Sequence, residues 1–328
     1  MVMRLNPEKE TGKAGENAEK TPLEKHGALS VRGTKLVDEK GNPVQLYGMS
    51  TRGLAWHPQY INEDTFRSLR DEWHNNCVRL AMFTGTPRGY CGGANRVYLK
   101  EMMRKGVDAA TRLGMYVIID WHVLVEKSPN VYADEAVKFF DEMSSVYRDQ
   151  DNVIYEICNE PNTASDWADI RAYAEKVIPV IRKNDPDAVI IVGTPTWSQD
   201  VDQAAENPLP YDHLLYTLHF YADTHRQELR DRAEKALQAG LPIIVSEFNC
   251  TSADGNGTAN TEEGDLWMEL IRKHNLSFLC WSLSNHPESS AVLLASCDKT
   301  SGWEEEDLDV TGKWVLPYFA AAYEAEKE

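Results

Sequence analysis

Two glutamates, Glu160 and Glu247, each follow a strongly apolar run of strand length, and their type and position suit catalysis. A pair of carboxyl groups that face each other can cleave a glycosidic bond, one as acid and the other as nucleophile or base. A single glutamate is most often a solvated surface residue. Because both glutamates follow sequences typical of buried strands, we interpret them as a functional pair.

Other reactive side chains stand at the same place, the carboxyl end of an apolar run. They are Arg79, His122, Asn159, His219, Tyr221 and Trp281. If the runs are parallel strands of a barrel, all these ends lie on the face where barrel enzymes place their sites. A single histidine is more often a core imidazole, but two at strand ends beside glutamates favour a site. Glu156 shares a face with Glu160 but lies deeper, so we interpret it as an internal structural carboxylate, paired with an interior arginine or water.

The elements that must position these residues alternate along the chain. Eight apolar runs are typical of parallel strands buried on both faces, and amphipathic segments separate them. The runs are 44–50, 77–83, 115–122, 153–160, 188–194, 214–221, 242–248 and 277–284, and the helical segments are 62–74, 95–113, 133–149, 166–184, 198–205, 224–239, 261–275 and 312–326. This alternation predicts a single α/β domain, a (β/α)₈ TIM barrel. Segments 28–31 and 35–38, separated by Gly33, predict a short N-terminal β-hairpin that closes the bottom of the barrel.

Charge and composition exclude several classes of protein. The 328 residues include 34 Lys and Arg against 52 Asp and Glu, a net charge of −18 that disfavours nucleic acid as a partner. No apolar run approaches the roughly 18 residues that cross a bilayer, so we expect no membrane span. The N-terminus lacks the apolar core of a signal peptide.

Domain organisation follows from the same composition. Residues 1–26 carry balanced charges and almost nothing apolar, so we predict a disordered tail or linker remnant there. Residues 27–328 are predicted to form one catalytic domain. The six cysteines form no CxxC pair, and Cys158 and Cys280 lie in apolar runs as expected of buried free thiols.

At Asn159-Glu160-Pro161 and Ser246-Glu247-Phe248 the chain resembles glycoside hydrolase family 5, the cellulases, and within it the bacterial endo-β-1,4-glucanases. The likeness runs from about residue 27 to the C-terminus. It is carried also by 47–51, 118–122, 152–157, 193–200, 218–221 and 281–284.

The resemblance implies a retaining double displacement on internal bonds of β-glucan, with Glu160 as general acid/base and Glu247 as nucleophile. Asn159 would hold the sugar 2-hydroxyl, and Arg79 would favour the charged form of Glu247. The other side chains expected around the sugar that is cleaved are His122, His219, Tyr221 and Trp281. Trp56 and Trp303 are expected as further stacking platforms.

Three places depart from the family pattern, and one of them is Asn249-Cys250, which stands where relatives usually carry Gly-Thr. Arg52 stands where relatives usually carry histidine, and His286 stands where they commonly carry lysine. We expect Arg52 of the first loop to contact substrate. We expect the same of His286 and Glu288, which belong to the eighth loop, residues 284–290. A fixed cation at Arg52 could hold an anionic glucan.

Other functions are less favoured. The chain lacks the HxH and HExxH spacings of metalloenzymes and the GxSxG motif of esterases, so we expect no metal and no cofactor. A β-mannanase or other β-1,4-glycanase of the same family is the alternative, followed by an inactive sugar-binding barrel. We expect a β-1,4-linked polysaccharide or oligosaccharide as partner, a monomer, and, by resemblance, a secreted or cell-surface location.

Overall fold

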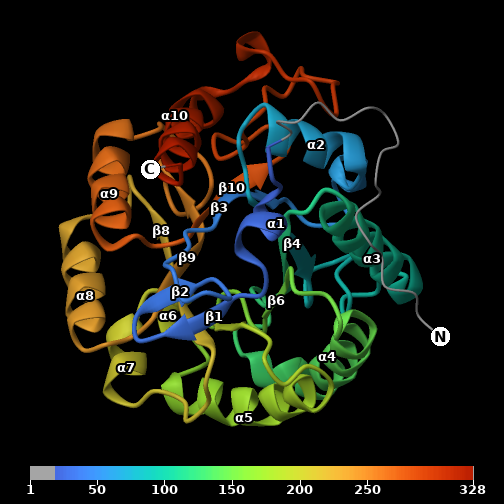
Figure 1. Ribbon diagram of the computed structural model, residues 1–328, viewed down its shortest axis with the longest axis vertical. Coiled ribbons are helices and arrows are strands. Elements are labelled where there is room, and N and C mark those ends of the chain that lie inside the picture. Colours follow the sequence, from blue (N-terminus) through green and yellow to red (C-terminus); the bar gives the residue numbers. More distant parts are fainter. Residues whose placement is uncertain (1–18, 328) are drawn as a thin grey trace.

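Eight parallel strands close into a barrel in the computed structural model, which describes residues 19–327 (Figure 1). Each strand pairs with the next along the chain, and the last closes on the first. The strands are β3 (Tyr47–Thr51), β4 (Cys77–Phe83), β5 (Tyr116–His122), β6 (Val153–Glu156), β7 (Ile190–Val192), β8 (Leu214–Tyr221), β9 (Ile243–Asn249) and β10 (Phe278–Leu283). The predicted (β/α)₈ barrel is confirmed.

Helices form a ring around the barrel, as Figure 1 shows. They are α2 (Glu63–Asp71), α3 (Arg96–Arg112), α4 (Ala133–Tyr147), α5 (Trp167–Asn184), α6 (Pro195–Ser198), α7 (Val201–Glu206), α8 (Gln227–Gln238), α9 (Thr261–His274) and α10 (Val310–Ala325), with 3₁₀ turns η1 (Pro58–Tyr60), η2 (Pro129–Tyr132) and η3 (Glu305–Asp307). Every predicted helical segment overlaps one of the α-helices. Within residues 19–327, no helix is long and apolar enough to span a membrane.

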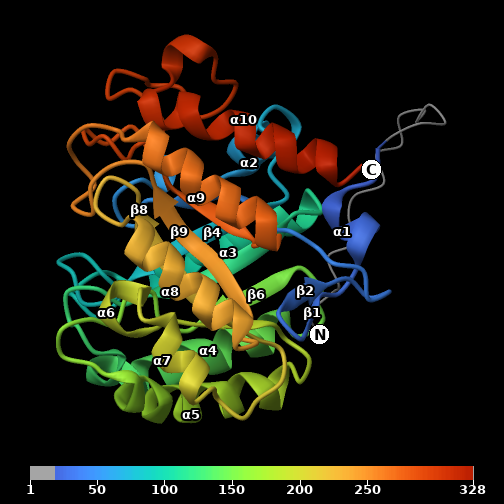
Figure 2. The ribbon, with the colours of Figure 1, turned by 90° about the vertical axis from the view of Figure 1, so that its left-hand side faces the viewer.

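A hairpin of β1 (Ser30–Arg32) and β2 (Lys35–Val37) covers one end of the barrel (Figure 2). Leu29 and Leu36 of this hairpin region pack in one buried apolar cluster with side chains from the barrel interior, among them Ile118, Ile191 and Ile244. This packing confirms the predicted plug. Because that end is closed by apolar side chains, reactive groups can gather only toward the other end.

Strand β5 shows how side chains that point alternately to the helices and to the barrel interior separate apolar from polar groups. Its residues Val117, Ile119 and Trp121 belong to the large core beneath the helices, whereas Tyr116 and Ile118 belong to the interior cluster at the plugged end. Because every second residue of a strand shares a face, Asp120 and His122 also point to the interior, further along the strand than Ile118. Along β5 the barrel interior therefore changes from apolar to polar.

The folded body begins before residue 27, so the predicted tail boundary is wrong. Residues Pro22–His26 form helix α1, which a capping box between Thr21 and Glu24 starts. The backbone N–H of Leu23 donates to the carbonyl of Gly114 at 2.9 Å, and the Leu23 side chain packs against the plug cluster. Charge balance concealed these contacts because it does not show which distant segments so short a helix meets. Residues 1–18 of the predicted tail lie outside the described residues.

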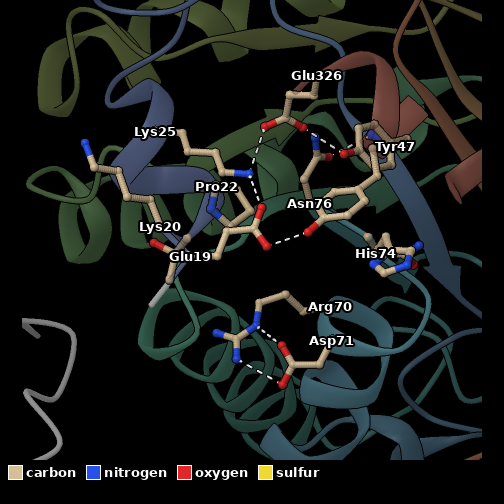
Figure 3. Close-up of a pocket in the computed structure, with 13 residues that line it drawn as sticks. Glu19, Lys20, Pro22, Lys25, Tyr47, Arg70, Asp71, His74, Asn76 and Glu326 are labelled. Atoms are coloured by element: carbon tan, nitrogen blue, oxygen red, sulfur yellow. Dashed lines mark hydrogen bonds and ion pairs between the residues drawn. The ribbon is translucent and has the colours of Figure 1, made fainter. Parts of the chain in front are cut away.

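Helix α1 is joined to the end of α10 through Glu326, as Figure 3 shows. The carboxylate accepts hydrogen bonds from the Tyr47 hydroxyl at 2.7 Å and from His26 Nε2 at 3.0 Å, and Lys25 lies 3.6 Å away. Burial opposes ionisation of Glu326, but the bonds from His26 and Tyr47 leave its pKa below the ordinary value. Lys25, Tyr47 and Glu326 line a pocket of about 350 Å³, and Glu19 belongs to the same lining.

Replacing Glu326 with alanine is expected to lower the free energy of unfolding by about 1–3 kcal/mol, because the buried Tyr47 hydroxyl loses its acceptor. Urea unfolding measures this loss. The matched control is Glu324→Ala, because that side chain lies on the same helix and is 69% exposed. Equal destabilisation by the two variants would show that the bonds to Glu326 add nothing to stability.

Candidate active site

Arg79 of β4 is fully buried and binds acceptors from several neighbouring strands. Its Nε and Nη2 donate to the two carboxylate oxygens of Glu156, at 2.7 and 3.1 Å. Nη2 also lies 2.6 Å from Asn159 Oδ1 and 3.0 Å from Asp120 Oδ2, and Nη1 lies 3.1 Å from Glu247 Oε2. Glu156 is thus paired with an interior arginine, as its sequence position predicted.

Two partners of Glu247, Arg79 and Tyr221, favour its charged form. In addition to Arg79, the Tyr221 hydroxyl donates to Glu247 Oε1 at 2.8 Å. Burial leaves the pKa of Glu247 above its ordinary value, although the Arg79 charge and the Tyr221 hydrogen bond oppose part of that rise. A carboxylate that is buried yet compensated in this way is suited to act as a nucleophile.

Glu160 lies in a different electrostatic environment. Its Oε1 is 2.9 Å from His219 Nδ1, and it has no arginine in hydrogen-bond contact among the described residues. Burial, followed by the charge of Glu247, raises the pKa of Glu160 well above the ordinary value. One oxygen of Glu160 and one of Glu247 lie within 4.8 Å of each other, and both side chains reach solvent at only 9% and 4% exposure. Two carboxyl groups so close do not both ionise readily, so Glu160 is suited to hold a proton.

His122 is neutral and fixed on both ring nitrogens. Nδ1 lies 2.6 Å from Asp120 Oδ2, and Nε2 lies 3.3 Å from Asn159 Nδ2. Burial lowers the pKa of His122 to about 3 and raises the pKa of Asp120 to about 7. The imidazole also stacks on Trp281, with ring centroids 5.2 Å apart. Sequence reasoning missed Asp120, although its position two residues before His122 on one strand face was the available signal.

Three tryptophans were predicted to stack against sugar rings, and the structure places them in different surroundings. Trp281 lies at the end of β10 beside Phe83 and Tyr221, and Trp56 is half-buried with its ring edge-on to Phe83 at 5.0 Å. The prediction of a Trp303 platform is wrong. Trp303 is 6% exposed and packs in the core against Trp73, with centroids 5.1 Å apart, because the segment between β10 and α10 folds back over α2.

Arg52 is not a free cation, which corrects the expectation drawn from its charge. Its Nε and Nη2 donate to the carboxylate of Glu288 at 2.7 and 2.8 Å, a two-pronged pair that neutralises both groups. His286 lies near this pair, with Nε2 3.9 Å from Glu288 Oε2, and its side chain is 40% exposed. The pair joins the first and eighth loops of the barrel mouth.

Trp197 is a further aromatic side chain that the sequence reasoning did not assign. It follows β7 and is 38% exposed. Its backbone N–H donates to the carbonyl of Pro161, the residue after Glu160, at 2.9 Å. Thr196, Trp197 and Ser198 all have φ near +55°, a conformation that non-glycine residues adopt at a cost and that clusters at functional sites. The signal available in the sequence was the position of Trp197 in 193–200, one of the segments that carry the family resemblance.

Glu160, His219 and Glu247 also offer three ligand atoms within 4.8 Å of one another, enough to hold a metal ion. A divalent cation there would occupy both carboxylates and the imidazole between Glu160 and Ser246. Such binding would engage the two side chains that the sequence analysis predicts as acid and nucleophile. The expectation that the protein needs no metal remains a prediction.

All six cysteines are free thiols, and Cys158 and Cys280 are fully buried, as predicted. They lie outside the network of charged groups around Arg79.

Comparison with known proteins supports this geometry. The family model for cellulases of glycosyl hydrolase family 5 matches residues 37–287. The chain belongs to this family. It is therefore a glycoside hydrolase, and the resemblance noted in its motifs is confirmed.

The chain is similar to several proteins named as endoglucanases. An endoglucanase A of Butyrivibrio fibrisolvens is 47% identical over 297 residues, covering 90% of this chain and 69% of that protein. An endoglucanase of Clostridium saccharobutylicum is 46% identical over 290 residues, covering 88% and 64%. A solved catalytic domain of a Thermobifida fusca endoglucanase in complex with cellotetraose is 35% identical, with a TM-score of 0.87, covering 92% of this chain and all of that one. The chain spans about two thirds of the length of these two curated relatives.

The different surroundings of Glu160 and Glu247 predict a bell-shaped dependence of kcat/KM on pH. Activity falls at low pH as Glu247 takes up a proton and at high pH as Glu160 loses one. Because a hydrogen bond to a carboxylate lowers its pKa, Tyr221→Phe is expected to raise the pKa of Glu247 and shift the acid limb upward by roughly one pH unit. The alkaline limb should stay in place. An acid limb that does not move would contradict the assignment of Glu247.

Proposed function

We propose that this chain is a retaining endo-β-1,4-glucanase that cleaves internal bonds of β-glucan. The observation that carries the proposal is the pair of carboxyl groups, Glu160 and Glu247, whose oxygens lie within 4.8 Å and whose hydrogen-bond partners differ, His219 for Glu160 and Arg79 with Tyr221 for Glu247. Retaining glycosidases hold their carboxyl groups about 5–5.5 Å apart, whereas inverting enzymes need room for a water between them. The endoglucanases similar to this chain support the same activity.

In the first step a Glu247 oxygen attacks C1 of the sugar while Glu160 gives its proton to the glycosidic oxygen. The bond between C1 and that oxygen breaks, the leaving chain departs as an alcohol, and the sugar remains esterified to Glu247. Arg79 and Tyr221 hold the attacking carboxylate in place and favour its charged form.

In the second step Glu160, now a carboxylate, takes a proton from water as the water oxygen attacks C1. The bond between C1 and Glu247 breaks, and the proton on Glu160 is restored. Two displacements at C1 return the β configuration. Asn159, held by Arg79 and His122, is placed to contact the sugar 2-hydroxyl, where the bond strengthens as positive charge develops.

Aromatic side chains define where the glucan chain lies. Trp281 forms the floor under the sugar that is cleaved, and Trp56 offers a platform from the first loop. Trp197, which is exposed beside Pro161, offers a third platform on the side of the acid/base. The substrate is a β-1,4-linked polysaccharide or oligosaccharide, in keeping with the cellotetraose bound to the Thermobifida fusca domain. The protein acts as a monomer in a secreted or cell-surface location.

A panel of soluble polysaccharides tests the substrate. Carboxymethyl cellulose should lose viscosity rapidly while few reducing ends appear, because internal bonds are cut first. Soluble mannan should be hydrolysed at least tenfold more slowly at equal concentration. Faster turnover on mannan would establish the β-mannanase alternative, and no reducing ends from either polymer would establish an inactive sugar-binding barrel.

The two glutamates should show separable roles. Glu160→Gln is expected to lose about 10²–10⁴-fold in kcat/KM on glucan but little in kcat/KM on an aryl cellobioside, because its good leaving group needs no proton in the first step. Glu247→Ala should inactivate the enzyme on both. Proton NMR of the wild-type reaction should show the β-anomer first. Equal losses on both substrates for Glu160→Gln, or the α-anomer first, would contradict the mechanism.

A further inference from the structure

Arg88 is an exposed cation that lies beside the tryptophan platform of the first loop. It belongs to the loop after β4, and its guanidinium carbon lies 6.0 Å from the centroid of the Trp56 ring. Its Nη2 donates to the backbone carbonyl of Ala55, the residue before Trp56, at 2.7 Å. These two contacts hold a positive charge next to a ring that the proposed function assigns to a sugar.

The backbone of the loop after β4 orders Arg88. The residue has φ +66°, a conformation that costs energy for any residue except glycine. Its N–H donates to the carbonyl of Gly92 at 3.2 Å, and the N–H of Gly92 donates to the carbonyl of Gly89 at 2.9 Å. The N–H of Gly89 in turn donates to the carbonyl of Thr86 at 2.7 Å. Because these bonds already order the loop, less conformational entropy is lost when Arg88 binds a ligand.

The guanidinium of Arg88 is not neutralised by the protein. Within residues 19–327, no carboxylate oxygen lies within 4.0 Å of its nitrogens, and only Nη2 donates a hydrogen bond. Arg52 differs, since its Nε and Nη2 both donate to Glu288. A guanidinium with unused donors can bind a carboxylate through two parallel hydrogen bonds. Arg88 therefore retains the capacity that Arg52 has lost to Glu288.

Other basic side chains on or against the first loop are paired or neutral. Arg52 is paired with Glu288, and His286 Nε2 lies 3.9 Å from the same carboxylate. Burial, followed by the charge of Arg52, lowers the pKa of His57 to about 4, so this residue after Trp56 is neutral at neutral pH. Among these side chains, Arg88 is the cation that can still bind an anion.

Trp56 and Arg88 lie away from the bond that is cleaved. Phe83 separates Trp56 from Trp281, with ring centroids 5.0 Å from the first and 6.1 Å from the second. In the closed order of strands, β3 and β7 are four positions apart in either direction. The first loop therefore lies across the barrel mouth from Trp197, the platform on the side of the acid/base. Arg88 is placed to meet the part of the glucan that stays on the enzyme after the first step.

We propose that Arg88 is a specificity-determining residue that binds carboxylate groups carried by a β-1,4-glucan where the chain stacks on Trp56. This inference rests on the proposed function and widens its substrate class to glucans that bear acidic groups. Arg88 thus takes the role that was expected of Arg52. The role has a physical purpose, because a protein of net charge −18 otherwise repels an anionic polymer.

The first test is Arg88→Gln, which removes the charge and keeps a polar side chain. At low salt, kcat/KM on carboxymethyl cellulose should fall about three- to fivefold, the range of an exposed ion pair. The value on hydroxyethyl cellulose, a neutral polymer, should stay at that of the wild type. The loss should lie in KM with kcat unchanged, because Arg88 holds the chain equally before and during the reaction. Salt at about 0.5 M should remove the difference, since it screens the charge.

Two further variants serve as controls. Arg32→Gln removes the same charge from an exposed position of β1, at the plugged end of the barrel, and should change neither polymer. Arg88→Lys keeps the charge and should retain most of the activity on carboxymethyl cellulose. Equal losses on both polymers in Arg88→Gln would overturn the proposal and leave Arg88 as a support for Trp56. A loss of the same size in Arg32→Gln would also overturn it, since net charge alone would explain the effect.

Equilibrium binding separates this inference from the proposed function. Calorimetric titration of Glu247→Ala, which should not turn over, compares cellotetraose with carboxymethylated cellotetraose. Adding Arg88→Gln should raise Kd for the carboxymethylated ligand about three- to fivefold and leave Kd for cellotetraose unchanged. Equal changes for the two ligands would overturn this inference alone. Binding of neither ligand by Glu247→Ala would contradict the proposed function and this inference together.

Discussion

A single buried cation, the guanidinium of Arg79, determines the arrangement of the active site. A charge without solvent is tolerated only when it is paired and its hydrogen-bond donors are used, and Arg79 meets that condition with Asp120, Glu156, Asn159 and Glu247. Arginine can do this because its fork of donors is rigid and permanently charged. Removing Arg79 would leave Asp120, Glu156 and Glu247 without their shared cation, which is a severe cost inside a barrel.

The charge of Arg79 also makes the surroundings of the two proposed catalytic glutamates different. Glu247 contacts the guanidinium directly, whereas Glu160 contacts a neutral imidazole. Identical side chains therefore acquire different pKa values from their surroundings, which is how one site holds an acid and an anion together. The apolar plug beneath the network strengthens these interactions because it keeps water from the plugged end of the barrel.

The ends of the chain and the loops at the mouth are held by pairs that are remote in sequence. Glu326 joins α10 to Tyr47 and α1, and Arg52 joins the first loop to Glu288 in the eighth. Both pairs tie the beginning of the barrel to its end, where closure between β10 and β3 must be maintained. A closed sheet gains from such ties because separation of the two end strands would expose unpaired backbone groups.

The sequence by itself determined the barrel, the hairpin plug and the positions of Glu160 and Glu247. These features depend on local patterns: apolar runs buried on both faces, amphipathic segments between them, and polar residues at the carboxyl ends of strands. Only the tertiary structure decided that Arg52 is neutralised by Glu288, that Trp303 packs against Trp73, and that α1 docks. It also placed Ser246 and Glu247 on the same side of β9. Each of these outcomes depends on which distant segment a side chain meets or on one extra residue in a strand. The local pattern of apolar and polar residues reveals neither.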